Sequence, residues 1–524
     1  MALTLAPNLV RGFTAVPYND NRHQNPYRLM RTKASIYSDG NPQMVKLFEQ
    51  AGHPAKVMCV ALDYAKATHT ALICNGQGDL LKGAFAVDNT PAGATQLLDQ
   101  VRQCAKSKKI RPEQVFFGGE DCPYFAENFL RRLRQEDYLV VRVNAWDAKQ
   151  QRSNLTASND SLDLLGVARC CLKRGGQPVR DLPEAYANLR IATRDRDKLV
   201  RLATATTNRI HTYVDRLFPG FLSPQQSGLT PFCQASVDLM SEQFSAAEIR
   251  RRRTLGQWLA RRGVTEPHAV AAQLKDLANT ALMPAPEQMV LLQRSLGHLV
   301  RLYRDLQESI GSLDRELAYW LARTPGALLT SISGIGVTLA GGWMAELGPP
   351  AQWRAVRQLS AYAGVVPRTK QTGGPQKPPV TGHVQQRCNK RFKNVVLLAV
   401  EKVRQFGPED LRRDAEKLQA QGSHIQFALA KRLVRLAKYL VHTGTIYRPR
   451  ALMDPNTSKE TLVLFYQEAW QKLLLKWKAK ADLKDVFAPK HPLGQWRQMV
   501  QALYALELPL PAQRAARKTG ASTP

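Results

Sequence analysis

A long run of apolar residues spaced three and four apart constrains this 524-residue chain more than any other feature. The run extends over residues 289–320, which is more than four heptads. Its members are Met289, Leu292, Leu296, Leu299, Tyr303, Leu306, Ile310, Leu313, Leu317 and Trp320. Such a pattern is typical of a coiled-coil seam and predicts one long helix. An ordinary amphipathic helix within a bundle is the alternative.

A second stretch with similar spacing lies earlier in the same helical region, which we place at 181–325. Its members are Leu199, Leu202, Thr206, Ile210, Tyr213 and Leu217. The two stretches can form one antiparallel arm within the chain, or they can pair between the subunits of a homo-oligomer, either a dimer or a tetramer. Residues 218–283 are then an insertion between them.

Residues 55–180 have a different pattern, in which short apolar strands alternate with helical segments. Three strand-like runs separated by turn residues come first, a helix is expected from Pro91, and strands follow at 114–120 and 138–146. A further helix is expected near Ser158. Three meandering strands followed by alternating helices and strands predict a mixed α/β sheet, in the element order of an RNase H-like fold.

The remaining parts of the chain differ from both. Residues 1–54 are polar and are interpreted as an N-terminal extension, and 451–524 as a C-terminal helical extension with a tail. Between them, 326–450 is predicted to be a mostly helical domain, in which Gly334-Ile335-Gly336 between two short apolar segments has the form of a helix-hairpin-helix. Residues 328–345 carry no charge, but their glycines favour a buried hairpin over a membrane span.

The charge balance points to nucleic acid as the first partner to consider. Lys and Arg outnumber Asp and Glu by 74 to 43, a formal net charge of +31. Such an excess favours a polyanionic partner, although a ribosome-surface or membrane-surface protein is the alternative. The residues expected to contact nucleic acid are Arg250, Arg251, Arg252, Arg253, Arg368, Lys370, Arg387, Lys390, Arg391 and Lys393. A solvated face is the plainer interpretation of the arginine run.

Four carboxylates occupy informative positions in the predicted sheet domain. Asp63 ends the first strand, Glu120 ends the strand at 114–120, and Asp160 and Asp163 lie three residues apart on the following helix. In an RNase H-like sheet these positions converge at one edge. Four acids there repel one another unless divalent cations neutralise them, and oxygen ligands suit Mg²⁺ or Mn²⁺. Two such ions can support phosphodiester chemistry.

These carboxylates also carry a family resemblance. With the segments 329–336, 359–368, 371–374 and 388–392, they resemble, in order and spacing, the DEDD-type bacterial insertion-sequence transposases, whose N-terminal domain is RuvC-like and whose relatives include the Piv DNA invertase. The resemblance covers roughly 57–215 and 285–445. It implies a metal-dependent transposase or recombinase that cuts and rejoins DNA at the ends of its element and at a target.

The resemblance further implies a nucleophile in the C-terminal domain, contributed by another subunit. Where the family has a serine, this chain has Thr372, and Ser360, Thr369 and Thr381 are nearby alternatives. Some family members are guided by a structured RNA encoded in the element. The protein is accordingly expected in the bacterial cytoplasm, associated with the nucleoid and not with a membrane.

Two other functions fit the same sequence. One is a RuvC-like metal-dependent nuclease that uses water and needs no hydroxyl nucleophile. The other is a non-catalytic nucleic-acid-binding descendant of a transposase. Formation of a covalent protein–DNA adduct discriminates the first alternative from a transposase.

Overall fold

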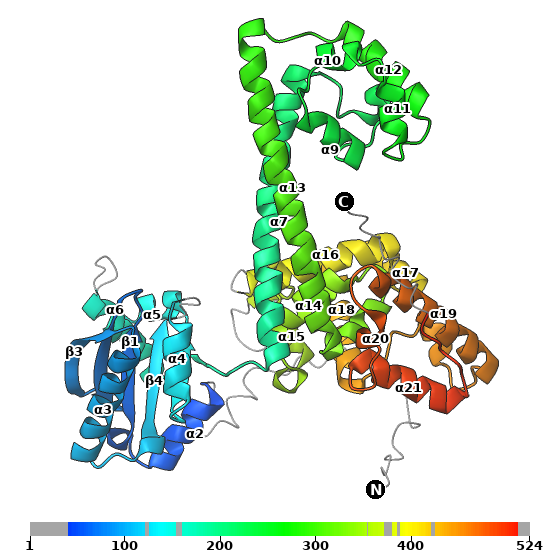
Figure 1. Cartoon of the computed structure of the whole chain (residues 1–524). Coiled ribbons are helices and arrows are strands. Elements are labelled where there is room, and N and C mark those ends of the chain that lie inside the picture. Colours follow the sequence, from blue (N-terminus) through cyan, green and yellow to red (C-terminus); the bar gives the residue numbers. More distant parts are fainter. Residues whose placement is uncertain are drawn as a thin grey trace, which may run out of the picture. The chain divides into compact units, whose positions relative to one another are not determined.

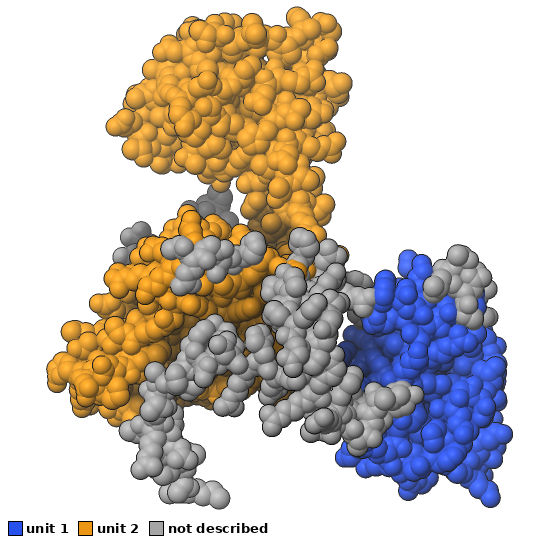
Figure 2. Space-filling model, turned by 180° about the vertical axis from the view of Figure 1, so that it is seen from behind, with its two compact units in different colours: residues 1–181, 373–378 blue, residues 182–372, 379–524 orange. Residues whose placement is uncertain are grey.

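The computed structural model describes residues 40–120, 125–152, 160–353, 355–370, 380–384, 388–420 and 425–511. The chain divides into two compact units, which Figure 2 shows in different colours. In the described residues, the first unit extends to Asp181 and the second begins at Leu182. Each unit is described separately below.

The first unit is built on a six-stranded mixed sheet in the order β3-β2-β1-β4-β5-β6. The strands are β1 (Met58–Asp63), β2 (Thr68–Asn75), β3 (Leu80–Asp88), β4 (Val115–Glu120), β5 (Leu139–Val143) and β6 (Gln177–Pro178). The central strand β1 pairs antiparallel with β2 and parallel with β4, and β4 pairs parallel with β5. This arrangement confirms the mixed α/β sheet predicted from the sequence.

Helices cover both faces of this sheet, which explains why β1 is a continuous apolar run. The helices are α2 (Pro42–Ala51), α3 (Pro91–Ser107), α4 (Glu127–Arg134), α5 (Ala145–Gln150) and α6 (Asp160–Leu172). Along β1, Met58 and Val60 belong to a core shared with α3 and α4, whereas Cys59 and Ala61 belong to a core shared with α2 and α6. The alternation places successive side chains on opposite faces.

Two local features of this unit differ from the sequence interpretation. The expected N-terminal extension contributes α2, whose Met44 is fully buried in the sheet domain. The strand expected over 138–146 ends at Val143, because the Asn144 side chain accepts a hydrogen bond from the Trp146 backbone N–H and caps α5. Helix α5 thus lies between β5 and α6 in the sequence, and Arg152, which follows α5, lies close to α6.

The long apolar stripe of the second unit lies on α13 (Pro286–Ala322), which packs antiparallel to α7 (Glu184–Leu217), as Figure 1 shows. Residues that share buried clusters run in opposite order along the two helices: Leu189 with Leu317, Ala203 with Leu306, and Ile210 with Leu296. Of the two arrangements considered, the structure has the arm within one chain. Pairing between subunits stays a prediction.

The insertion forms its own helical cluster against the ends of these two helices. Its helices are α8 (Pro224–Ser227), α9 (Gln234–Ser241), α10 (Ala246–Arg251), α11 (Leu255–Ala260) and α12 (Pro267–Thr280). Phe218, Phe221 and Phe244 pack together in its core, with ring centroids 4.7–6.0 Å apart. Val214 and Leu296 belong to the same core, so the insertion is an extension of the arm.

The rest of the second unit is mostly helical and has one large core. Its elements up to 443 are the 3₁₀ helix η4 (Pro325–Ser331), α14 (Val337–Leu347), α15 (Val356–Tyr362), β7 (Pro367–Lys370), β8 (Val380–Val384), α16 (Lys390–Phe406), α17 (Glu409–Ala420) and α18 (Ile425–Thr443). The C-terminal extension adds α19 (Lys459–Lys478), α20 (Leu483–Val486) and α21 (Pro492–Tyr504). Trp470, Trp477 and Trp496 of the extension are buried in the shared core.

The element expected to be a helix-hairpin-helix has a 3₁₀ helix, η4, in place of its first α-helix. The turn before α14 contains Gly334 at φ +88°, a conformation that favours glycine. The Lys476 ammonium of α19 donates to the carbonyls of Thr330, Ile332 and Ile335, the last two at 2.9 and 3.2 Å. A lysine of the extension therefore holds this turn, and burial lowers the pKa of Lys476 to about 8.

The apolar stretch at 328–345 belongs to this buried core, as predicted. Across the described parts of the chain, we find no helix with the length and apolar character needed to span a membrane.

Candidate active site

Asp63 and Glu120 lie at matching ends of two neighbouring strands. Strands β1 and β4 are parallel, and their register pairs Leu62 with Gly119, so the next residues of both strands reach the same sheet edge. Both side chains are half-buried. The convergence predicted from the ends of the strands is therefore present in the structure for these two acids.

The third acid reaches this edge from α6, which packs against β1 and β4. Asp163 lies one turn into α6, and its negative charge acts on Glu120 together with that of Asp63. Asp160 is the first residue of α6, but its side chain lies outside the described part of the structure. The three acids with described side chains thus form one electrostatic cluster, and the backbone places Asp160 three residues from Asp163.

The pKa of Glu120 reflects both its burial and the repulsion among these acids. Burial raises the pKa of Glu120, and the charges of Asp163 and Asp63 raise it further, while Arg152 offsets part of the rise. Its Oε1 atom is buried and has no hydrogen-bond partner among the described residues. A buried carboxylate oxygen without a donor is costly and is free to coordinate a cation.

Arg152 is a charged member of this cluster that the sequence interpretation missed. Its guanidinium forms an ion pair with Asp163 Oδ1, although that oxygen accepts no well-aligned hydrogen bond. The Arg152 side chain is only 9% exposed and that of Asp163 21%. No sequence signal identified it, because Arg152 follows a short helix that was not predicted and whose first two residues were interpreted as the end of a strand.

Two further residues, Tyr64 and His69, shape the site and were given no role in the sequence interpretation. The Tyr64 ring lies over Gly119, where an added Cβ would be 2.2 Å from the ring, so a side chain at 119 would displace Tyr64. The buried His69 accepts a hydrogen bond from the Ala65 N–H at 3.1 Å, which fixes the turn after Asp63. The pair Gly118-Gly119 before Glu120 is the one feature of the sequence that indicates such a close approach.

The carboxylates of this cluster suit a divalent metal ion, although the described side chains do not form a complete metal site. No three Asp, Glu, His or Cys side chains in the described ranges converge as a metal ion requires. Arg152 lies against Asp163, and the Asp160 carboxylate is outside those ranges. The carboxylate oxygens, with the buried and unpaired Glu120 Oε1, nevertheless have the chemistry that Mg²⁺ or Mn²⁺ prefers.

The candidate nucleophile follows β7 of the second unit in the sequence. Thr372 and Arg387 lie outside the described residues, as do the side chains of Arg368 and Lys370. The flanking strands β7 and β8 form an antiparallel pair in which Thr369 lies opposite Thr381. Of the alternative hydroxyl residues, Ser360 is 3% exposed, which disfavours it as an attacking group.

A polar network around the buried Glu346 includes residues that flank the β7–β8 pair in the sequence. The Glu346 carboxylate accepts hydrogen bonds from Arg194 at 3.1 and 3.3 Å and from Asn389 Nδ2 at 2.8 Å. Asn389 also contacts the Tyr362 hydroxyl at 2.7 Å, and its N–H donates to the Tyr362 carbonyl. The network ties the segments that precede β7 and follow β8 to α7 and α14.

The basic residues expected to contact nucleic acid differ in their surroundings. Arg250 and Arg253 are exposed and make no hydrogen bond or ion pair with described residues. Arg251 is exposed and pairs with Glu248, whereas Arg252 is half-buried, pairs with Glu242 at 2.6 Å and lies over the Trp258 ring. The arginine run is therefore partly structural.

The three basic residues in the first turn of α16 differ in how far they are exposed to solvent. Lys390 and Arg391 are exposed, and Lys393 is half-buried near the Phe427 ring. Arg391 lies 3.9 Å from Asp197 in an exposed ion pair.

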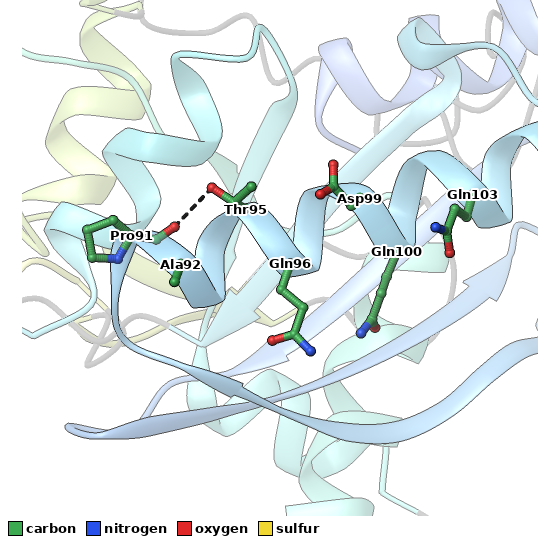
Figure 3. A pocket seen from close by; sticks show the side chains of 7 residues that line it. All are labelled: Pro91, Ala92, Thr95, Gln96, Asp99, Gln100 and Gln103. Carbon is green, nitrogen blue, oxygen red and sulfur yellow. Dashed lines mark hydrogen bonds between the residues drawn. The ribbon is translucent and has the colours of Figure 1, made fainter.

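The hollow shown in Figure 3 lies along one face of α3 and is not part of this site. It is lined by Pro91, Ala92, Thr95, Gln96, Asp99, Gln100 and Gln103. None of the four expected acids lines it, and Asp99 is its single charged residue, so it offers no comparable donor set.

Comparison with known proteins identifies the family. Residues 60–219 match a transposase family model of the DEDD, IS110 type, and residues 326–413 match the model of the IS116/IS110/IS902 transposase family. These two matches, with the relatives below, support an insertion-sequence transposase of the IS110/IS116 type. The first match runs from β1 through α7, and the second from η4 into α17. Most of the insertion and all of α19–α21 lie outside both IS110-type matches.

Individual relatives agree with this assignment. The chain is 22% identical over 340 residues to an uncharacterized 44.8 kDa protein of insertion element IS116 from Streptomyces clavuligerus, covering 64% of this chain and 81% of that protein. It is 30% identical over 195 residues to the transposase for IS1328 of Yersinia enterocolitica, and 28% identical over 181 residues to a probable family 20 transposase of Pseudomonas aeruginosa. These two matches cover 35% and 32% of this chain, and 55% and 51% of the relatives.

Proposed function

We propose that this IS110-type transposase cuts and rejoins DNA at the ends of its own insertion sequence and at a target. The observation that supports this most directly is the cluster of Asp63, Glu120 and Asp163. Burial and the charges of the two aspartates raise the pKa of Glu120, whose buried Oε1 has no hydrogen-bond partner among the described residues. We assign the unit that carries the cluster to the RNase H-like, RuvC-like class, an assignment that its six-stranded mixed sheet supports.

In this proposal the four acids Asp63, Glu120, Asp160 and Asp163 hold one or two Mg²⁺ or Mn²⁺ ions. When bound, such ions activate a nucleophile and stabilise a leaving oxygen in phosphodiester transfer. The protein's part is to hold the carboxylates on rigid elements: the ends of β1 and β4 and the first turn of α6. The Tyr64–Gly119 and His69–Ala65 contacts fix the strand ends.

Thr372 is proposed as the attacking hydroxyl, provided by another subunit of a dimer or tetramer. A covalent ester between the protein and DNA conserves the phosphodiester bond energy until the strands are exchanged. A threonine hydroxyl is a weak nucleophile at its own pKa and needs a base or metal beside it. Its stiff, branched side chain makes attack more hindered than attack by serine.

The partners in this proposal are element-end DNA, target DNA and, by resemblance to part of the family, a structured guide RNA. Exposed Arg250, Arg253, Lys390 and Arg391 support phosphate binding, because they present cations to solvent. We place the protein in the bacterial cytoplasm, associated with the nucleoid.

The test is to incubate the purified chain with its element ends and Mg²⁺ and to look for covalent and strand-exchanged products. Asp63→Asn should abolish both products, and Asp99→Asn, an exposed acid on α3, is the matched control. Strand exchange by Asp63→Asn would rule out the metal assignment.

The nucleophile is tested by Thr372→Val, which is nearly isosteric but lacks the hydroxyl, and by Thr372→Ser. Loss of the adduct in the valine variant and a higher rate in the serine variant would support Thr372. DNA cleavage by the parent without any adduct would favour the water-using nuclease, the second candidate that the missing serine keeps open.

A further inference from the structure

We propose that Arg152 is the built-in counter-ion of the acid cluster and competes with the divalent metal for it, so that Arg152 sets the metal affinity of the site. This inference rests on the proposed function, because it assumes that the four acids bind metal. It concerns a residue that lies outside the DEDD pattern.

The first support is the contact itself. Arg152 reaches Asp163 Oδ1 with a side chain that is 9% exposed, so the ion pair is largely shielded from water. Screening by solvent is weak at such a position, and the interaction is stronger than that of a surface pair. A carboxylate oxygen in contact with a guanidinium cannot at the same time coordinate a metal ion closely.

The second support is that Arg152 acts on the whole cluster. Its positive charge opposes the effects of Asp63 and Asp163 on Glu120. A guanidinium stays protonated in proteins, so this charge leaves the cluster only when the side chain moves. Its charge offsets that of the acids, but it does not satisfy every carboxylate oxygen, because Glu120 Oε1 has no donor among the described residues. That oxygen remains of the kind that Mg²⁺ prefers as a ligand.

The third support is that local structure directs Arg152 to this place. The α6 residues Arg169 and Lys173 bind the Gln151 carbonyl and side chain at 3.0 and 2.5 Å, next to Arg152. Gly166 of α6 allows close packing, since an added Cβ would be 2.5 Å from the Ala148 carbonyl oxygen and 3.2 Å from Arg152 Cγ. The arginine is thus held against the helix that carries Asp160 and Asp163.

The consequence is an exchange of cations. Without metal, Arg152 offsets the repulsion among the acids and stabilises the folded unit. When a divalent ion enters, Asp163 must release the guanidinium, so the measured metal affinity is reduced by the strength of the ion pair. This linkage predicts opposite effects of removing Arg152 on metal-free stability and on metal binding.

The experiment measures Mn²⁺ binding to the full chain by calorimetry, without DNA, for the parent, Arg152→Lys and Arg152→Gln. We expect affinity to rise in that order, with Arg152→Gln binding roughly tenfold more tightly, as one charge interaction of ordinary size implies. Lys106→Gln removes the same charge from an exposed position on α3 and should bind as the parent does.

Melting curves provide a second readout. In EDTA, Arg152→Gln should melt below the parent, and saturating Mn²⁺ should raise its melting temperature by more than it raises that of the parent. If Arg152→Gln does not fold, Arg152→Lys, with an intermediate affinity, carries the test.

The outcomes separate this inference from the function on which it rests. Mn²⁺ binding to the parent with equal or weaker binding to both Arg152 variants would overturn the inference and leave the metal site intact. Absence of Mn²⁺ binding in all variants would overturn both. Binding that appears only in the Arg152 variants would support competition most strongly.

Discussion

Two glutamates, the half-buried Glu120 of the first unit and the buried Glu346 of the second, have carboxyl pKa values shifted in opposite directions. At Glu120 burial and the charges of Asp163 and Asp63 raise the carboxyl pKa, and one of its oxygens has no donor among the described residues. At Glu346 burial also acts to raise the pKa, but hydrogen bonds from Arg194 and Asn389 and the charges of Arg194 and Arg190 outweigh it, and the pKa is lowered. The same residue type is left unsatisfied in one unit and fully paired in the other.

The difference distinguishes a carboxylate of a candidate functional site, Glu120, from one that supports the fold, Glu346. A paired buried acid strengthens the fold, and removing it leaves its partners without an acceptor. An unpaired acid in a cluster weakens the fold until a ligand arrives, which is the condition expected of a functional site.

The largest expected effect comes from removing the charge of each glutamate in turn. Glu346→Gln should lower the free energy of unfolding by about 2–4 kcal/mol, because Arg194 loses its buried partner. Glu120→Gln should leave metal-free stability unchanged or raise it, since it relieves repulsion. Chemical denaturation in EDTA measures both, and a large loss at Glu120 would break the contrast.

The pH dependence of these two variants should also be opposite. The lowered pKa of Glu346 gives stability that is fully present above its ordinary pKa of 4.5 and is lost as the pH falls through the folded-state value. The deficit of Glu346→Gln should therefore shrink on acidification. The raised pKa of Glu120 costs stability as the pH rises through the folded-state value, so any gain in Glu120→Gln should disappear at low pH.

A smaller effect is expected at Lys476, which tests whether full pairing is a general property of the second unit. Lys476→Met should lower the free energy of unfolding by roughly 2 kcal/mol, because three carbonyls of the turn before α14 lose their donor. Lys472→Met, on the same helix in an exposed pair with Glu468, is the control and should be nearly neutral. Equal losses in both variants would contradict a specific role for Lys476.

The smallest effect concerns surface charge and applies the same contrast to arginines. Replacing the unpartnered Arg250 and Arg253 by Ala should reduce the salt dependence of DNA binding by up to about two units of log–log slope, at about 0.9 per phosphate contact. Arg252→Ala removes a cation that is paired with Glu242 and stacked on Trp258, and should leave the slope unchanged. A parent-like slope in the double variant would place DNA elsewhere.

Sequence patterns were sufficient to predict the elements that have a periodic apolar pattern or a clear residue signal at one end. The three-four spacing predicted α13, the strand runs predicted the mixed sheet, and Pro91 marked the start of α3. The positions of Asp63 and Glu120 at the ends of parallel strands followed from the same reasoning. Strand 138–146 was predicted too long, because Asn144 and the helix after it give only a weak local signal.

The sequence by itself therefore determined the periodic elements and the residues at their ends, because backbone geometry links spacing directly to position. Only the tertiary structure decided that the apolar seam of α13 is filled by α7, that Arg152 meets Asp163, and that Lys476 holds a turn 141 residues or more away in the chain. It also decided that, among the described residues, Glu120 Oε1 has no donor while Glu346 is paired. Charge pairing and desolvation depend on which side chains meet in the folded core, and these meetings cannot be derived from the spacing of residues along the chain.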